Sequence, residues 1–270
     1  MKRTNKSNKI LGLVAALFLT GCGSNSGGNS VTGGGGGGDP LPAIEGKWTI
    51  NSTSTEGHIN SVLLVNLSNQ GSGNFYAPQV VLCYNNPALT CYGSFAGNGS
   101  LSIQGTVTAQ GDVSMSITSS PQDATGCTAT YTGTLAVGSI SGTYTGCGDA
   151  GTMTATLDPS VTGTYTGQLT SGANPGLLPF SISASITEAG DHSLTGSASI
   201  TNSPCFTSLS FGPPSIAVGA SVYLQDATHG ITVITPLENP TVPSGINVVY
   251  TVEPTQYCGA DYGSGTLTKQ

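Results

Sequence analysis

Residues 180–187 read FSISASIT, a strict alternation of apolar and hydroxyl-bearing side chains. Successive side chains of a β-strand point to opposite faces of its sheet, so one face of this segment is apolar and the other is polar. The apolar side chains are Phe180, Ile182, Ala184 and Ile186. The pattern predicts an antiparallel strand with one face in the core and the other in water.

Residues 111–118, GDVSMSIT, show the same alternation, and short runs of this kind recur through residues 41–270. Glycine, asparagine and proline separate the runs, which is typical of antiparallel barrels and sandwiches. Open sheets usually protect their edge strands with charged residues, above all lysine, and this region holds only Lys47 and Lys269 as basic residues besides histidine. We therefore predict an all-β fold and favour a barrel, which has no edge strands, over a sandwich.

Six short segments recur in the same order in the two halves of this region. The matched segments are 46–49 with 163–166, 108–114 with 187–193, 117–121 with 200–204, 136–138 with 217–219, 147–148 with 258–259, and 151–154 with 265–268. The ordered matches predict a duplication, with one antiparallel β unit over residues 41–158 and a second over residues 159–270. Each unit is about 115 residues long, a usual size for a domain with its own core.

Each predicted unit opens on a glycine followed two residues later by an aromatic residue, GKW at residues 46–48 and GTY at residues 163–165. The segment GKWT at residues 46–49 resembles the opening of calycin barrels, the group of lipocalins and avidin-type proteins. In that group the tryptophan closes one end of the barrel and the other end takes a ligand. The resemblance implies a ligand site at a barrel mouth. The alternative is a core aromatic residue on a first strand.

The first 21 residues have the three parts of a secretory signal peptide. Residues 1–9 carry four basic residues and no acidic one, and residues 10–19 form a ten-residue apolar run. A helix that crosses a bilayer needs about 20 apolar residues, so this run is too short to span it. A basic start, a short apolar middle and small residues at the end are typical of an exported protein.

The end of this segment, Leu19-Thr20-Gly21-Cys22, resembles the lipobox of bacterial lipoproteins. The resemblance implies cleavage after Gly21, a diacylglyceryl thioether on Cys22 and an acyl chain such as palmitate on its new amino group. Two or more acyl chains anchor a protein stably, whereas one does not. In lipoproteins an aspartate after the lipidated cysteine favours inner-membrane retention, so Gly23 makes the outer membrane the expected location. Residues 22–40 follow as a glycine-, serine- and asparagine-rich linker, expected to be a flexible coil.

Residues 22–270 carry thirteen acidic residues against two lysines, a formal charge of −11. A nucleic-acid-binding protein needs a basic surface for phosphate contacts, and this composition excludes one. With nucleic acid excluded, the expected partners are membrane lipid, which binds through the acylated Cys22, and a small ligand, a glycan or an envelope protein.

Seven cysteines leave six for disulfides once Cys22 is assigned to lipid, and an exported protein can form them. The internal repeat makes one pair of cysteines in each half equivalent, and the remaining two lie within nine residues of each other. The predicted bridges are Cys83–Cys91, Cys127–Cys147 and Cys205–Cys258. Residues 83–91, CYNNPALTC, would then form a small clasped loop.

The sequence predicts no catalytic residue, no cofactor-binding residue and no metal ligand, because it lacks a nucleophile elbow, a zinc-binding helix and close cysteine pairs. Asp149 and Asp261 lie beside glycines, and the simplest interpretation is that they are solvent-exposed loop residues. The alternative is a pair of carboxylates for the hydrolysis of a glycosidic bond. Asp226 and His229 could share a metal, but the sequence His229-Gly230 is typical of a hairpin turn.

Tyrosines next to cysteines are the candidate binding residues, since rigid aromatic rings on constrained loops often contact sugars or proteins. They are Tyr84, Tyr92, Tyr257 and Tyr262. The alternative role is packing against the disulfides. The sequence thus predicts an exported, membrane-anchored lipoprotein of binding type that holds a small apolar molecule or a glycan. The alternative is a structural or interaction lipoprotein of the cell envelope without a small ligand.

Replacing Cys22 tests the anchor. In the variant Cys22→Ser no thioether can form, so we expect the protein to leave the membrane fraction while its β units stay folded. Fractionation of cells, with circular dichroism of the released protein, measures both. A variant that is cut after Gly21 and still sediments with membranes contradicts the assignment.

Overall fold

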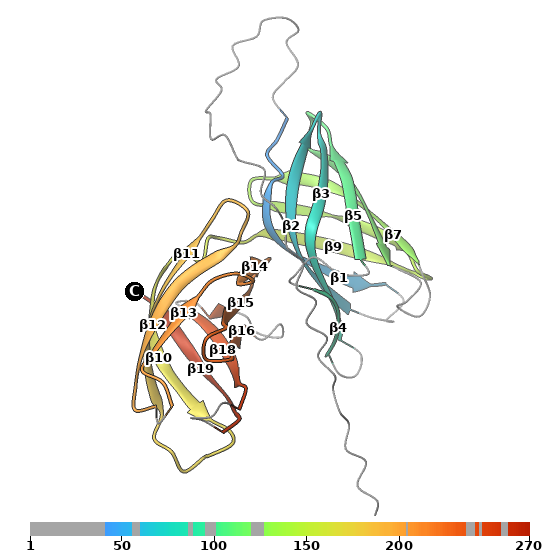
Figure 1. The fold of residues 1–270 in the computed structure, drawn as a ribbon. Coiled ribbons are helices and arrows are strands. Elements are labelled where there is room, and N and C mark those ends of the chain that lie inside the picture. Colours follow the sequence, from blue (N-terminus) through green and yellow to red (C-terminus); the bar gives the residue numbers. More distant parts are fainter. Residues whose placement is uncertain are drawn as a thin grey trace, which may run out of the picture. The chain divides into compact units, whose positions relative to one another are not determined.

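The computed structural model describes residues 41–55, 60–85, 89–94, 101–119, 127–203, 205–235, 241–242, 245–254 and 259–270. Every helix or strand assigned in these ranges is a β-strand, which confirms the predicted all-β class (Figure 1). No helix in the described ranges has the length and apolarity needed to cross a membrane. The predicted signal peptide, Cys22 and the predicted linker all lie in residues 1–40, outside the described residues.

The first nine strands form one antiparallel sheet. They are β1 (Gly46–Ser54), β2 (Asn60–Gly71), β3 (Asn74–Asn85), β4 (Leu89–Ser94), β5 (Leu101–Val107), β6 (Asp112–Ser119), β7 (Thr128–Ala136), β8 (Ser139–Gly146) and β9 (Asp149–Leu157). Their order is β2-β1-β9-β8-β7-β6-β5-β3, and β2 also pairs with β3, so eight strands close into a barrel. β4 extends this sheet by pairing with the end of β3.

Large side chains fill the interior of this barrel. Along β6, Val113, Met115 and Ile117 are buried and the residues between them face outward, as the alternation in GDVSMSIT predicts. Trp48 and Phe75, each 1% exposed, belong to the same core cluster. The closed ring therefore encloses a packed core.

The remaining strands form a second sheet that curls. They are β10 (Gly163–Ser171), β11 (Phe180–Glu188), β12 (Leu194–Thr201), β13 (Ser208–Phe211), β14 (Ile216–Val218), β15 (Ser221–Asp226), β16 (Ile231–Ile234), β17 (Thr241–Val242), β18 (Gly245–Val252) and β19 (Asp261–Lys269). Their order is β13-β12-β11-β10-β19-β18-β16-β15-β14, with β17 paired to β18. The two end strands of this sheet, β13 and β14, do not pair with each other, so the sheet does not close into a barrel. The four apolar side chains of FSISASIT lie on β11 and are all buried.

The two ends of this second sheet are consecutive in the chain. β13 and β14 are separated by residues 212–215, which include Pro213 and Pro214, and proline has no N–H to give to a ladder. One strand is thereby split, so that β13 pairs with β12 and β14 with β15. Across the remaining seam, the backbone N–H of Ser210 donates to Oδ2 of the buried Asp226 at 2.8 Å.

The first and last strands of the two units are equivalent. Trp48 pairs with Leu157 between β1 and β9, and Tyr165 pairs with Lys269 between β10 and β19. The indole Nε1–H of Trp48 donates to the carbonyl four residues earlier at 2.9 Å, and the hydroxyl of Tyr165 does the same at 2.7 Å. The predicted match of residues 46–49 with 163–166 is confirmed.

The middle of the predicted repeat alignment is wrong. Residues 108–114 lie at the β5–β6 turn, after the fifth strand of the first unit, whereas residues 187–193 lie at the β11–β12 turn, after the second strand of the second unit. Both turns have the same hydrogen bonds, because the N–H of Gly111 and of His192 each donates to the carbonyl three residues before it. Similar turn chemistry produced the match.

Three other matched pairs of segments are also not equivalent in the structure. The pairs 117–121 with 200–204 and 136–138 with 217–219 also join strand ends at different places in the two meanders. The match of 151–154 with 265–268 is two residues out of register, because Gly151 pairs with Ser54 and its equivalent Gly263 pairs with Ser171.

The Cys127–Cys147 disulfide is confirmed, with an S–S distance of 2.06 Å. Cys83 and Cys205 are also disulfide-bonded, and the backbone of Cys83 lies directly opposite that of Cys91. The side chain of Cys91 and all of Cys258 lie outside the described residues, so these two pairings stay predictions. Residues 83–91 were predicted as a clasped loop, but strands β3 and β4 reach Asn85 and Leu89, so the segment is a hairpin.

A buried ion pair joins the two sheets. Nζ of Lys47 on β1 lies 2.8 Å from Oε2 of Glu188 at the end of β11, and the two side chains are 2% and 5% exposed. Glu188 also accepts hydrogen bonds from Nδ1 of His192 and from the backbone N–H of Val161, each at 2.8 Å. Burial alone raises the pKa of Glu188, but these hydrogen bonds and the Lys47 charge outweigh it and lower the pKa to about 2.

Asn66 on β2 makes a second connection, to β14 and the turn after it. Its side-chain Nδ2 donates to the carbonyl of Ala217 at 2.7 Å, and its Oδ1 accepts from the N–H of Gly219 at 3.3 Å. Leu64, Ile216 and Val218 pack in the apolar cluster beside it. The first barrel thus covers one end of the second sheet.

Replacing Lys47 tests the buried pair. Lys47→Met leaves the Glu188 carboxylate buried without its lysine, so we expect a loss on the order of 3 kcal/mol in the free energy of unfolding. Lys269→Met, at an exposed lysine, should change it by less than about 0.5 kcal/mol. Urea denaturation followed by circular dichroism measures both. Equal midpoints for the two variants contradict a stabilising role for the pair.

Candidate functional site

A carboxylate at the start of β19 is held by three donors. Oδ1 of Asp261 accepts from the hydroxyl of Ser171 at 2.7 Å and from the backbone N–H of Tyr262 at 2.8 Å, and Oδ2 accepts from the hydroxyl of Tyr250 at 2.9 Å. Tyr250 pairs with Gly263 across β18 and β19. A Cβ at Gly263 would lie 2.6 Å from the Tyr250 ring, so glycine makes room for the tyrosine.

The first unit contains the same cluster at equivalent positions. Asp149 begins β9, and its carboxylate accepts from the hydroxyls of Ser54 at 2.8 Å and Tyr144 at 2.7 Å. Tyr144 pairs with Gly151, where a Cβ would lie 2.8 Å from the tyrosine ring. The cluster of serine, aspartate and tyrosine is therefore a duplicated feature of the fold. We call the two copies the Asp149 cluster and the Asp261 cluster.

Both tyrosines of these clusters stay protonated. Burial raises the pKa of Tyr144 and of Tyr250 above the ordinary tyrosine value, and the carboxylates of Asp149 and Asp261 raise it further. Each tyrosine is thus a neutral hydrogen-bond donor to an aspartate at physiological pH.

The surroundings of the two clusters differ. In the first unit, the ring of Tyr131 stacks on Tyr144 with centroids 5.4 Å apart, and Tyr131 is 5% exposed. In the second unit, the ring of Phe180 is tilted against that of Tyr250, with centroids 6.5 Å apart. A pocket of about 80 Å³ lies beside the Asp261 cluster.

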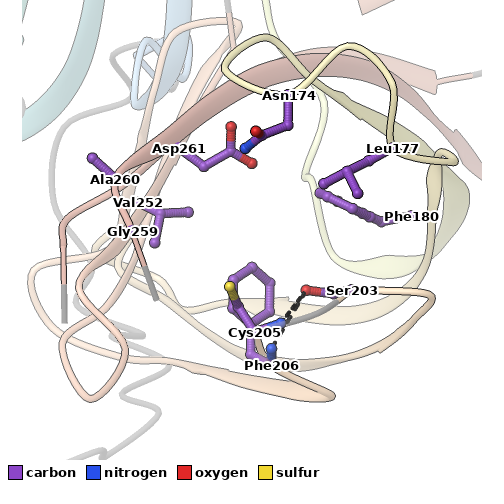
Figure 2. A pocket seen from close by; sticks show the side chains of 10 residues that line it. All are labelled: Asn174, Leu177, Phe180, Ser203, Cys205, Phe206, Val252, Gly259, Ala260 and Asp261. Atoms are coloured by element: carbon purple, nitrogen blue, oxygen red, sulfur yellow. Dashed lines mark hydrogen bonds between the residues drawn. The ribbon is translucent and has the colours of Figure 1, made fainter. Parts of the chain in front are cut away.

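The pocket combines a polar side with apolar walls. Its lining residues are Asn174, Leu177, Phe180, Ser203, Cys205, Phe206, Val252, Gly259, Ala260 and Asp261. Figure 2 shows the Asp261 carboxylate and the Asn174 amide pointing toward each other at one side, with Phe180 and Leu177 beside them and Phe206 opposite. Pockets for drug-sized ligands measure roughly 300–1,000 Å³, so this one suits a much smaller group.

Two short loops hold the pocket residues in place. The hydroxyl of Ser203 accepts hydrogen bonds from the backbone N–H groups of Cys205 and Phe206, at 3.2 and 3.4 Å. The hydroxyl of Ser171, which donates to Asp261, also accepts from the backbone N–H of Asn174 at 2.9 Å. Ser171 therefore connects the loop after β10 to the carboxylate.

Of the four tyrosines that the sequence singled out, only the side chain of Tyr262 is described, and it lies outside the pocket lining. Tyr262 is 59% exposed on β19 and is not among the residues that line the pocket. Tyr84 and Tyr92 are strand residues of β3 and β4 whose side chains, like all of Tyr257, lie outside the described part. The signal that marks the observed cluster is Asp-x-Gly at the start of the last strand of each unit, at residues 149–151 and 261–263.

Asp226 and His229 form a hydrogen-bonded pair that has a structural role. Nδ1 of His229 lies 2.8 Å from Oδ2 of Asp226, whose other oxygen accepts from the backbone N–H groups of Thr228 and His229. Burial raises the pKa of Asp226, but these hydrogen bonds and that from Ser210 lower it below its usual value. Asp226 thus caps the β15–β16 turn and bonds across the seam. Within the described ranges, no three His, Cys, Asp or Glu side chains are grouped to hold a metal.

Asp191, His192 and Ser193 form part of the turn between β11 and β12. Oδ1 of Asp191 accepts from the N–H and the hydroxyl of Ser193, while the ring of His192 turns to Glu188. Asp191 and His192 are therefore not arranged as a catalytic pair.

Comparisons with known proteins add no function. No family model matches the chain, and no curated protein matches it. A solved structure, of a protein of unknown function from the DUF3598 family of Nostoc punctiforme PCC 73102, is similar over 84% of this chain and 96% of that one, with 11% identity. Its TM-score is 0.27, too low to support any conclusion.

Removing one tyrosine hydroxyl tests the duplicated cluster. Tyr250→Phe takes a donor from Asp261, and we expect a loss of about 1–2 kcal/mol in the free energy of unfolding, with a similar loss for Tyr144→Phe. The exposed Tyr262 offers the control Tyr262→Phe, which should be nearly neutral. Urea titrations give all three values, and a Tyr250→Phe midpoint equal to that of the control contradicts the role of the cluster.

Proposed function

We propose that this protein is an exported, lipid-anchored binding protein whose second β unit holds a small ligand. The lipobox at residues 19–22 and the glycine-rich linker support attachment of the β units to a membrane through the acylated Cys22. Gly23 after the lipidated cysteine favours the outer membrane. The ligand site is the pocket beside the Asp261 cluster.

The observation that carries this proposal is the difference between two equivalent positions. The Asp149 cluster packs against the stacked ring of Tyr131, whereas the Asp261 cluster borders a pocket with two phenylalanines, Phe180 and Phe206. Apolar walls with a few convergent polar groups are the usual form of a ligand site. An apolar portion of the ligand would contact the rings, and a polar group would contact Asp261 and Asn174.

A structural or interaction lipoprotein is the second candidate. Large buried side chains, among them Trp48, Phe75 and Met115, belong to the core of the first barrel, as in a unit with a structural role. Leu178, 76% exposed in the loop after β10, offers an apolar contact to another protein. Crosslinking in cells followed by purification would recover a stable partner if this role is the main one.

Filling the pocket tests the ligand site. Ala260 lines it and is exposed, so Ala260→Trp should occupy the space without disturbing the core. A thermal-shift screen of the purified full chain would use D-glucose, N-acetylglucosamine, short alcohols and short alkylamines. We expect at least one compound to raise the melting temperature of the unmodified protein but not of Ala260→Trp.

The matched control is Val137→Trp, which places the same ring on the fully exposed β7–β8 turn of the first unit. This variant should respond to the compound as the unmodified protein does. No response of the unmodified protein to any compound, or an undiminished response of Ala260→Trp, favours the interaction role instead.

A further inference from the structure

We infer that the pocket of the second unit binds a small alkylammonium compound through Asp261. This inference rests on the proposed function and names the chemical class of the ligand. It depends on three features of the described residues, namely the charge around Asp261, the hydrogen bonds to its carboxylate and the rings that face it.

The described part of the chain provides no lysine or arginine for Asp261. Residues 41–270 contain two lysines and no arginine. Lys47 is paired with Glu188, and Nζ of Lys269 lies 5.9 Å from the centre of the Tyr165 ring and 3.4 Å from the carbonyl of Ser160. None of the residues that line the pocket is basic. A cationic ligand would supply the missing charge.

The carboxylate can accept a further hydrogen bond. A carboxylate offers about four acceptor positions. Ser171, Tyr250 and the N–H of Tyr262 fill three of them among the described residues, and Oδ2 receives only the Tyr250 hydroxyl. The three donors hold the group in one orientation. An ammonium group has three N–H donors and could bond to Asp261 and to the side-chain oxygen of Asn174 together (Figure 2).

The walls suit the rest of such a ligand. Phe180 and Phe206 present aromatic rings, and rings attract cations at their faces and alkyl groups by burial. A volume of about 80 Å³ fits an ammonium with a short alkyl chain better than a sugar ring. The formal charge of −11 on residues 22–270 also raises the local concentration of cations and lowers that of anions.

A matched pair of probes tests the charge. n-Propylammonium and n-propanol have nearly the same shape, and only the first is charged. Saturation-transfer NMR titrations of the purified full chain in non-ionic micelles, with empty micelles as blank, give a dissociation constant for each. We expect n-propylammonium to bind at least about tenfold more tightly, as a charge-assisted hydrogen bond implies.

Two equivalent variants locate the contact. Asp261→Asn removes the charge at the pocket. Asp149→Asn removes it at the equivalent position of the first unit, where Tyr131 stacks on Tyr144, with the same loss of an internal acceptor. We expect Asp261→Asn to weaken n-propylammonium binding about tenfold and Asp149→Asn to leave it unchanged. If Asp261→Asn does not fold, the comparison of n-propylammonium with n-propanol on the unmodified protein still tests whether the pocket requires a charged ligand.

Each other outcome overturns the inference in a distinguishable way. Equal affinity for n-propanol means that the pocket takes apolar groups without regard to charge. Binding of D-glucose or N-acetylglucosamine in place of n-propylammonium means that the ligand is a glycan, and the proposed function stands. An equal loss in both aspartate variants means that Asp261 makes no direct contact. Absence of binding by all four probes removes the ligand site of the proposed function as well.

Discussion

The need to give every sheet edge a hydrogen-bonding partner is the constraint on which the rest of this structure depends. Backbone N–H and C=O groups at a sheet edge need partners. The first sheet meets this need by pairing β2 with β3. In the second sheet the segment with Pro213 and Pro214 splits a strand, and the carboxylate of Asp226 accepts the Ser210 N–H at the seam. Asn66 and its apolar neighbours on the first barrel cover β14 beside it.

The same skeleton then gives two different environments. In both units the last strand begins with an aspartate that a serine and a tyrosine hold, and a glycine opposite the tyrosine gives its ring room. What differs is the neighbouring strand and loop. Tyr131 stacks on the first tyrosine, whereas the loops after β10 and β12 leave a pocket beside the second. The two units thus share an internal hydrogen-bond cluster but differ in what surrounds it, and the second copy borders the pocket lined by Phe180 and Phe206.

The candidate site was only partly predictable. The nearness of Tyr262 to a cysteine predicts a binding role for it. Pocket lining depends on which face of β19 a residue occupies, however, and its neighbour Asp261 lines the pocket. The glycines near Asp261 predict a loop, whereas Asp261 is the first residue of β19. Its partners Ser171 and Tyr250 come from strands β10 and β18, whose adjacency to β19 is a property of the sheet order. The repeat alignment failed at its centre for a related reason, since hairpin turns of one type share residues wherever they occur in a meander.

The sequence by itself determined the all-β class, the buried face of strands such as β6 and β11, the equivalence of the first strands and the Cys127–Cys147 bridge. These are local or short-range properties, because side-chain alternation and hairpin cysteines act within one strand or between neighbours. Only the tertiary structure decided that the first sheet closes, that the second is split, and that Lys47 meets Glu188 across 141 positions of the chain. These features depend on which distant segments pack together, and that choice arises from the combined burial and hydrogen bonding of the whole fold.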